Sequence, residues 1–144
     1  MDYRVERLRT PDECEIFAAN AIARKRPDLA MEAHRKAVEL QAATHEASSP
    51  VEAEAFAALY AYEALLARKN GKKTRATKTW AVVKSRGVIE AIRQCVNGAV
   101  EPESFARLRE LGLETHAFDA LVVRNAASFD DATVRVAQSR LADG

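Results

Sequence analysis

The chain has 144 residues, 48% of them hydrophobic, and its 22 Lys and Arg residues nearly balance 21 Asp and Glu residues. This length suits one domain, or two small helical subdomains that share a core, without a need for disulfides or a metal. Glycine (5) and proline (4) are scarce, which favours helix over sheet. No apolar stretch approaches the roughly 20 residues of a membrane span, and no secretory signal is apparent, so we expect a cytoplasmic protein. The cysteines, Cys14 and Cys95, are expected to be buried free thiols.

The first two helices are marked by their start and stop residues. Residues 10–13 (TPDE) form a capping box with proline at the first helical position, and apolar spacing continues the helix to about Lys25. Pro27 begins a second helix, which the sequence Ser48-Ser49-Pro50 is expected to end. The segment PDLAMEAHRKAVEL resembles the second helix of a tetratricopeptide repeat, but no second copy follows, so we interpret the pair as an ordinary helical hairpin.

A long third helix follows a second capping box, residues 49–52 (SPVE), and ends at Asn70-Gly71. Its apolar stripe runs from Val51 to Leu66, and Phe56 and Tyr60 lie beside that stripe. The helix is therefore apolar on more than one face. Two interpretations remain open: burial within the chain, which we favour, and pairing with a second copy.

The rest of the chain predicts shorter helices. A fourth is expected over residues 75–86 and a fifth over 88–97, with Gly87 between them. Three short helical patterns follow, at 105–111, 118–125 and 134–141, and either Ser128 or the pair Asp130-Asp131 is a candidate cap for the last. These helices should pack on the rest because they are too short to be stable alone. The predicted fold is an all-α bundle of about six to eight helices. We expect one helical domain over 1–144, with an extended arm (1–9), main helices (10–98) and a small C-terminal helical part (99–144).

Positive charge is concentrated in one part of the chain. Residues 64–89 hold eight positive charges and no acid, so that 14 basic and 21 acidic residues remain elsewhere, a net charge of −7. Such segregation predicts a polyanion or an acidic partner better than the overall charge does. The eight residues are Arg68, Lys69, Lys72, Lys73, Arg75, Lys78, Lys84 and Arg86.

The fourth helix is expected to be amphipathic. At helical spacing its apolar side carries Ala76, Trp80 and Val83, and its cationic side carries Arg75, Lys78 and Arg86. Trp80 is therefore expected to dock the helix on the core. Lys72 and Lys73 precede the N-terminus of this helix, where they add to the positive end of its dipole, an arrangement that suits anion binding. Thr74 and Thr77 add hydroxyls that can reach phosphate oxygens.

We therefore expect residues 69–86 to contact nucleic-acid phosphates, with Trp80 fixing the helix that carries the charges. The candidate contact residues are Lys72, Lys73, Arg75, Lys78, Lys84 and Arg86. Two other interpretations of the same charges remain open: a solvated surface that pairs with acids of this chain, and a site for an acidic protein partner. A membrane-surface role is not expected, because the helix lacks the bulky apolar face of interfacial helices.

The stretch YAYEALLARKNGKKTRATKTWAVVKSRGVIEAIRQCVN and the later stretch FARLRELGLETHAFDALVVRNAASF resemble a family of small bacterial all-helical proteins of unassigned function that share a KNGKKTRATKTW-like segment. The resemblance implies a compact bacterial helical domain and no activity.

Catalytic chemistry is not apparent in the sequence. It has no nucleotide-binding loop, no serine elbow and no Cys/His cluster with zinc spacing, so we expect no enzyme activity, no cofactor and no metal. His34 and His45 are expected on one side of the second helix, about 16 Å apart, too far to share a metal. The predicted function is a non-enzymatic nucleic-acid-binding accessory protein. The alternative is a protein-interaction or homodimerisation module.

Overall fold

The computed structural model describes residues 1–98 and 103–143. Within these residues the chain forms nine α-helices, two 3₁₀-helices and no strand, which confirms the all-α class. The helices are α1 (Tyr3–Glu6), α2 (Pro11–Ala23), α3 (Pro27–Ala42), α4 (Pro50–Asn70), α5 (Thr77–Arg86), α6 (Val88–Asn97), α7 (Ser104–Leu111), α8 (Phe118–Arg124) and α9 (Asp131–Asp143), with the 3₁₀-helices η1 (Glu114–His116) and η2 (Ala126–Ser128).

The N-terminus differs from the prediction. The expected extended arm over residues 1–9 is wrong, because Tyr3–Glu6 form one helical turn, α1. The side chain of Asp2 caps this turn by accepting the backbone N–H of Arg4 at 2.9 Å. Val5 is fully buried, and the backbone N of Asp2 donates to Glu32 on α3 at 3.3 Å. A side-chain cap and one buried apolar side chain therefore hold this short segment as a helix against α3.

Three further helices begin at side-chain caps. Thr10 accepts the N–H of Glu13 at 3.1 Å, and Ser49 accepts the N–H of Glu52 at 3.3 Å, so both predicted N-caps are confirmed. The glutamate of each pair reaches back one residue further than in a standard capping box, to the N–H of Arg9 and of Ser48. For the last helix, the structure selects one of the two candidate caps. Asp130 accepts the N–H of Thr133 at 2.7 Å, whereas Ser128 lies in η2. The charged carboxylate of Asp130, which directly precedes the helix, accepts the backbone N–H in place of the more distant Ser128.

Helix α3 ends earlier than predicted. Its last residue is Ala42, so the second helix does not reach Ser48, and residues 43–49 form a loop to α4. His45 lies in this loop and not on the helix with His34. The ring of His45 packs on side chains of α4 and α5, which draws the chain out of the helical path.

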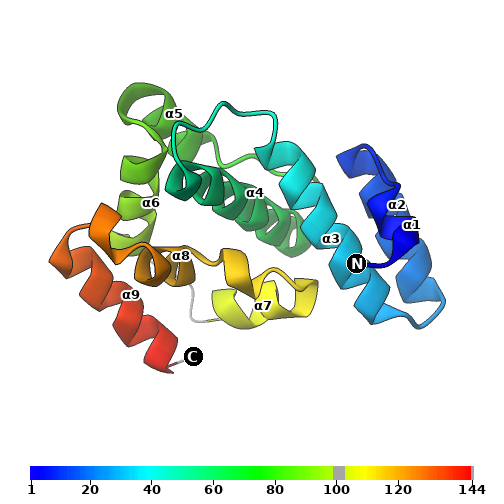
Figure 1. The fold of residues 1–144 in the computed structure, drawn as a ribbon. Coiled ribbons are helices and arrows are strands. Elements are labelled where there is room, and N and C mark those ends of the chain that lie inside the picture. Colours follow the sequence, from blue (N-terminus) through cyan, green and yellow to red (C-terminus); the bar gives the residue numbers. More distant parts are fainter. Residues whose placement is uncertain (99–102, 144) are drawn as a thin grey trace.

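Helix α4 is the centre of the fold. All of residues 55–61 are buried, and α3, α6, α7 and α8 surround the helix (Figure 1). Phe56 and Leu59 belong to a cluster with α6, α8 and α9, whereas Tyr60 and Leu65 belong to one with α3 and α7. The two apolar faces of α4 are therefore both used inside the chain, which favours the first of the two interpretations of this helix.

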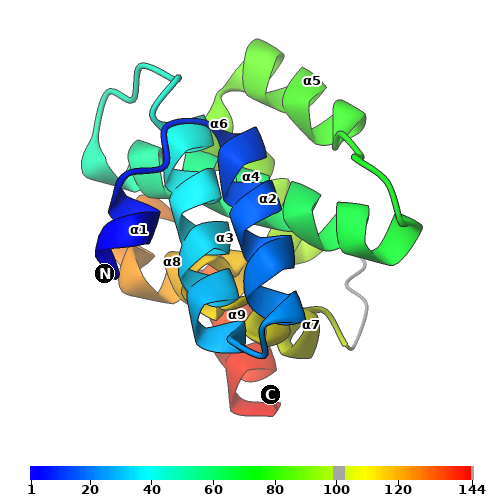
Figure 2. The ribbon, with the colours of Figure 1, turned by 90° about the vertical axis from the view of Figure 1, so that its right-hand side faces the viewer.

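Helices α2 and α3 form the predicted hairpin on the outside of α4, with small residues such as Ala18 and Ala33 at their contact (Figure 2). The other side of α3 fixes the end of α7. The His34 Nδ1 atom lies 3.1 Å from the carbonyl oxygen of Leu111, and Arg35 donates to the carbonyl of Gly112 at 3.2 Å. Both contacts satisfy carbonyls that the helix end leaves without a partner.

The short C-terminal helices pack on the rest, as predicted. Leu121 and Val122 of α8 and Ala137 of α9 are fully buried in the cluster that contains Leu59 and Ile92. The predicted division after residue 98 borders residues 99–102, which lie outside the described residues.

Candidate nucleic-acid interface

The predicted basic segment, residues 69–86, lies at one edge of the molecule. Gly71 ends α4 with a left-handed φ of 72°, a turn of residues 72–76 follows, and α5 begins at Thr77, two residues later than predicted. Figure 2 shows the turn running around the end of α4 and α5 standing at the outer edge of the fold. All six predicted contact residues are exposed: Lys72, Lys73, Arg75, Lys78, Lys84 and Arg86.

A single buried carboxylate holds this segment in place. Glu63 of α4 is only 8% exposed, and its Oε2 atom accepts the backbone N–H of Ala76 at 2.8 Å and the Nε1–H of Trp80 at 2.8 Å. The same oxygen lies 3.3 Å from Nε of Arg75. Three donors from the turn and from α5 therefore converge on one oxygen of α4. The hydrogen bonds and the ion pair offset the free-energy cost of burying this carboxylate. Because hydrogen bonds to a charged acceptor are strong, they also hold the three donors in place.

Trp80 docks α5 in an aromatic cluster, as the sequence predicts, but its partners were not predicted. The ring of His45 stacks on the rings of Phe56, at 4.3 Å between centroids, and of Trp80, at 5.3 Å. Tyr60 lies 5.3 Å from the centroid of Trp80, and its hydroxyl is 2.7 Å from Nε2 of His45. The loop after α3, the centre of α4 and α5 are thus joined through four rings.

The electrostatics of this cluster favour a neutral imidazole. Burial, and to a smaller extent the charge of Arg75, lower the pKa of His45 below its ordinary value, because both penalise the protonated ring. Burial likewise raises the pKa of the Tyr60 hydroxyl. The four rings of the cluster are therefore uncharged near neutral pH.

The structure divides the six predicted residues into groups. Arg75 precedes α5 and turns towards Glu63, with its guanidinium carbon 5.4 Å from the Trp80 ring centroid, although 59% of its side chain remains exposed. Lys78 and Arg86 are eight residues apart and lie within about 80° of one another around the helix, whereas Lys84 lies on a different side. Within the part of the chain that the structure describes, no ion pair involves Lys72, Lys73, Lys78 or Lys84.

Part of the anion-binding potential of the turn is already used by the protein. The N–H of Ala76, at the N-terminus of α5, binds Glu63, so this carboxylate takes the place in which a phosphate was expected. The hydroxyl of Thr74 donates to the carbonyl of Lys72 at 2.9 Å and accepts from Asn70 at 3.2 Å. Thr77 keeps its exposed position. Binding of a polyanion would therefore depend on the cationic side chains rather than on the helix terminus.

Gly87 separates α5 from α6. Its φ of 91° and ψ of 163° are accessible to glycine and to almost no other residue, and nothing lies within 4 Å of a Cβ placed there. Glycine is thus required here by the backbone and not by packing. It allows α5 to fold back on α6, which α5 contacts along its length.

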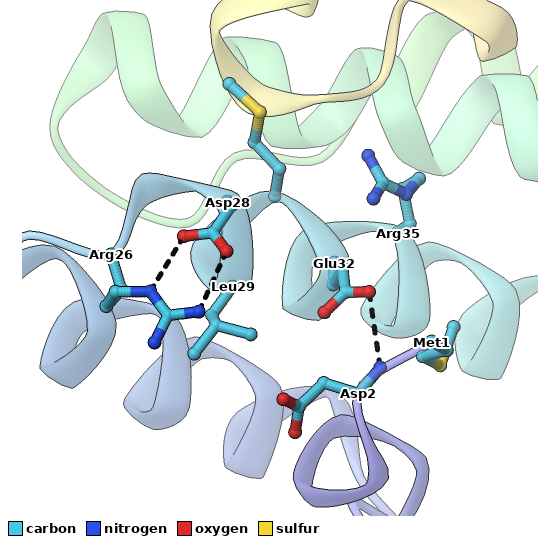
Figure 3. A pocket seen from close by; sticks show the side chains of 8 residues that line it. Met1, Asp2, Arg26, Asp28, Leu29, Glu32 and Arg35 are labelled. Atoms are coloured by element: carbon cyan, nitrogen blue, oxygen red, sulfur yellow. Dashed lines mark hydrogen bonds and ion pairs between the residues drawn. The ribbon is translucent and has the colours of Figure 1, made fainter.

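A shallow pocket lies between α1 and the start of α3, far from α5 (Figures 1 and 3). Its charged groups already have partners: Arg26 pairs with Asp28 at 3.0 Å, Glu32 accepts the backbone N–H of Asp2, and Arg35 donates to the carbonyl of Gly112. These contacts account for the polar groups at the pocket without a ligand.

Histidine and cysteine residues do not form a metal site in the described ranges, 1–98 and 103–143, where no group of three or more His, Cys, Asp or Glu side chains is placed to hold an ion. Cys14 and Cys95 are both free thiols, as expected, but only Cys14 is fully buried. The pKa of His116 is lowered mainly by burial.

Of the helices in the described residues, each is too short or too polar to traverse a lipid bilayer.

Comparison with known proteins adds no relative, since no protein-family model, curated protein or solved structure matches the chain.

Proposed function

We propose that the protein is a non-enzymatic, cytoplasmic nucleic-acid-binding accessory protein that contacts phosphates through residues 69–86. One observation carries this proposal. Lys72, Lys73, Lys78 and Arg86 project from an edge segment whose position is fixed by Glu63 and Trp80. A fixed array of cations binds a polyanion with less loss of conformational freedom than a flexible basic tail would.

Of the six candidate contact residues, Arg75 is shared with Glu63 and Lys84 lies on a different side of α5, so we expect four contacts, from Lys72, Lys73, Lys78 and Arg86. Each contact releases counterions from the nucleic acid. The slope of log K against log salt should therefore be about −3.6 for duplex DNA, since each contact contributes about −0.9. Lys84, on a different side of α5, adds to the field without a contact of its own.

The test is a fluorescence anisotropy titration of a labelled duplex over a salt series. The variant Lys72→Ala/Lys73→Ala should bind more weakly and reduce the magnitude of the slope by about 1.8. The charge-matched control is Arg7→Ala/Arg9→Ala, which removes two exposed cations near α1, at the other end of the molecule, and should leave the slope unchanged. A slope near zero for the native protein, or an equal effect of both variants, would refute the proposal.

An acidic protein partner is the alternative use of the same cations. It is favoured if the folded protein fails to bind any nucleic acid at low salt, because the cations of the segment would then need another anion. The homodimer version of the alternative is weakened, since Phe56 and Tyr60, each 8% exposed, are buried within the chain. Light scattering that shows a monomer at high concentration would remove it.

A further inference from the structure

We infer that the basic segment binds the phosphate backbone of a double helix in preference to single-stranded nucleic acid. This inference rests on the proposed function and adds the class of ligand. Proteins that bind single strands combine a cationic groove with aromatic side chains on which bases stack, and each stacked base contributes substantially to affinity. The inference follows from the packing of the aromatic side chain near the cations, which leaves no ring free for a base to stack on.

The basic run has one aromatic residue, Trp80, among residues 64–89. Its ring is already surrounded. His45 stacks on it at 5.3 Å, Tyr60 lies at 5.3 Å, and the guanidinium carbon of Arg75 lies at 5.4 Å from the ring centroid. Its Nε1–H is bonded to Glu63. Trp80 therefore serves as the anchor of α5, and a base would have to displace its neighbours in order to stack on it.

No other aromatic side chain near the segment replaces Trp80 as a stacking platform. Within the described part of the chain, the large hydrophobic residues that are exposed are Met1, Tyr3, Ile16 and Ile22, all on α1 and α2 or beside them. Figures 1 and 2 place α1 and α5 at opposite ends of the molecule. A strand bound along α5 would thus meet charges and hydroxyls but no free ring.

The arrangement of the charges suits a stiff and dense polyanion. Lys78 and Arg86 are fixed on one helix, about 12 Å apart along its axis. Duplex DNA carries about one charge per 1.7 Å of its axis and keeps its phosphates in place, whereas a single strand has a lower charge density and releases fewer counterions per contact. A fixed cation array without stacking platforms therefore gains more from the duplex.

The inference is tested with three labelled ligands of equal length, about 20 nucleotides per strand: duplex DNA, duplex RNA and unstructured oligo-dT. At one salt concentration, we expect the duplex with the higher affinity to bind the native protein about tenfold more tightly than oligo-dT does. The two duplex arms separate DNA from RNA as the source of the backbone. The fluorescence of Trp80, the only tryptophan, should not be quenched by oligo-dT, because no base reaches its ring.

Two results would overturn the inference while the proposed function stood: oligo-dT that binds as tightly as the better duplex, or oligo-dT that quenches Trp80. A second variant gives an independent check. Trp80→Phe should change the affinities for duplex and oligo-dT by the same factor, since Trp80 positions the cations for both, and a loss confined to oligo-dT would show that the ring stacks on bases. Absence of binding to all three ligands would overturn both the inference and the proposed function.

Discussion

Glu63 makes the sharpest stability prediction for this protein. Glu63→Ala removes the oxygen that accepts from Ala76 at 2.8 Å and from Trp80 at 2.8 Å and that faces Arg75 at 3.3 Å. An N–H group left unsatisfied in a buried site costs about 1–3 kcal/mol. Ala76 is buried, but Trp80 is only partly so, and water can reach part of the site. We therefore expect a loss of about 2–4 kcal/mol in the free energy of unfolding.

Glu63→Gln separates the charge from the shape. Glutamine keeps an acceptor oxygen at the same distance along the side chain but cannot pair with the charge of Arg75 and binds N–H groups more weakly than a carboxylate. The expected loss is about 1–2 kcal/mol. A matched control on the same helix is Glu54→Ala. Glu54 forms an exposed ion pair with Arg124, 3.0 Å, whose removal should cost less, about 0.2–1 kcal/mol.

The assay is urea unfolding followed by far-UV circular dichroism and by tryptophan fluorescence. Because Trp80 is the only tryptophan, fluorescence reports the docking of α5, whereas circular dichroism reports the whole helical fold. In Glu63→Ala, the fluorescence transition should move to lower urea than the dichroism transition. The reasoning is refuted if Glu63→Ala unfolds within about 0.5 kcal/mol of the native protein, or no more easily than Glu54→Ala.

Two further predictions concern packing and pH. Gly112→Ala should destabilise the fold by about 2–4 kcal/mol, because the residue has a φ of 78° and a Cβ there would lie 2.6 Å from the Cβ of Met31. The control is Gly71→Ala, which has a φ of 72° but no atom within 4 Å of the new Cβ, and should cost only about 1 kcal/mol. Equal losses of stability in urea unfolding would contradict the steric argument. The lowered pKa of His45 means that the unfolded chain takes up a proton before the folded chain as pH falls below about 6.5, so stability is kept above that pH and declines below it. His45→Phe should therefore lose less stability than the native protein between pH 7 and pH 5 in the same assay, and an unchanged difference would show that His45 does not contribute to it.

Much of the fold was predictable because its signals are local. The N-caps at Thr10 and Ser49 and the glycine at position 71 each act within one helical turn, and the structure has all three where the sequence places them. Errors arose where a distant contact decides the outcome. The end of α3 carries no stop residue near Ala42, and the loop that follows is set by the packing of His45 on α4 and α5.

The site was predictable in its charges but not in its scaffold. The cations at Lys72, Lys73 and Lys78 could be found from composition alone. Glu63 was missed because a glutamate in a long helix is usually solvent-exposed. One signal was available: at helical spacing Glu63 falls on the same side as Phe56, and beyond the first helical turn, which holds Glu52, it is the only charge on that apolar side. It is also the last acid before the acid-free run of residues 64–89.

The two glycines that bracket the basic segment have a consequence for how the protein opens. Neither Gly71 nor Gly87 has an atom within 4 Å of the position of a Cβ, and α5 itself contains no fully buried residue. The segment between them, residues 72–86, is therefore joined to the rest of the chain at two glycines and is held against the core by the contacts of Glu63 and Trp80. Its amides should exchange with solvent through a subglobal opening that leaves α4 intact. For the same reason, we expect that residues 72–86 can be replaced by a segment of different charge without disrupting the core packing of the remaining helices.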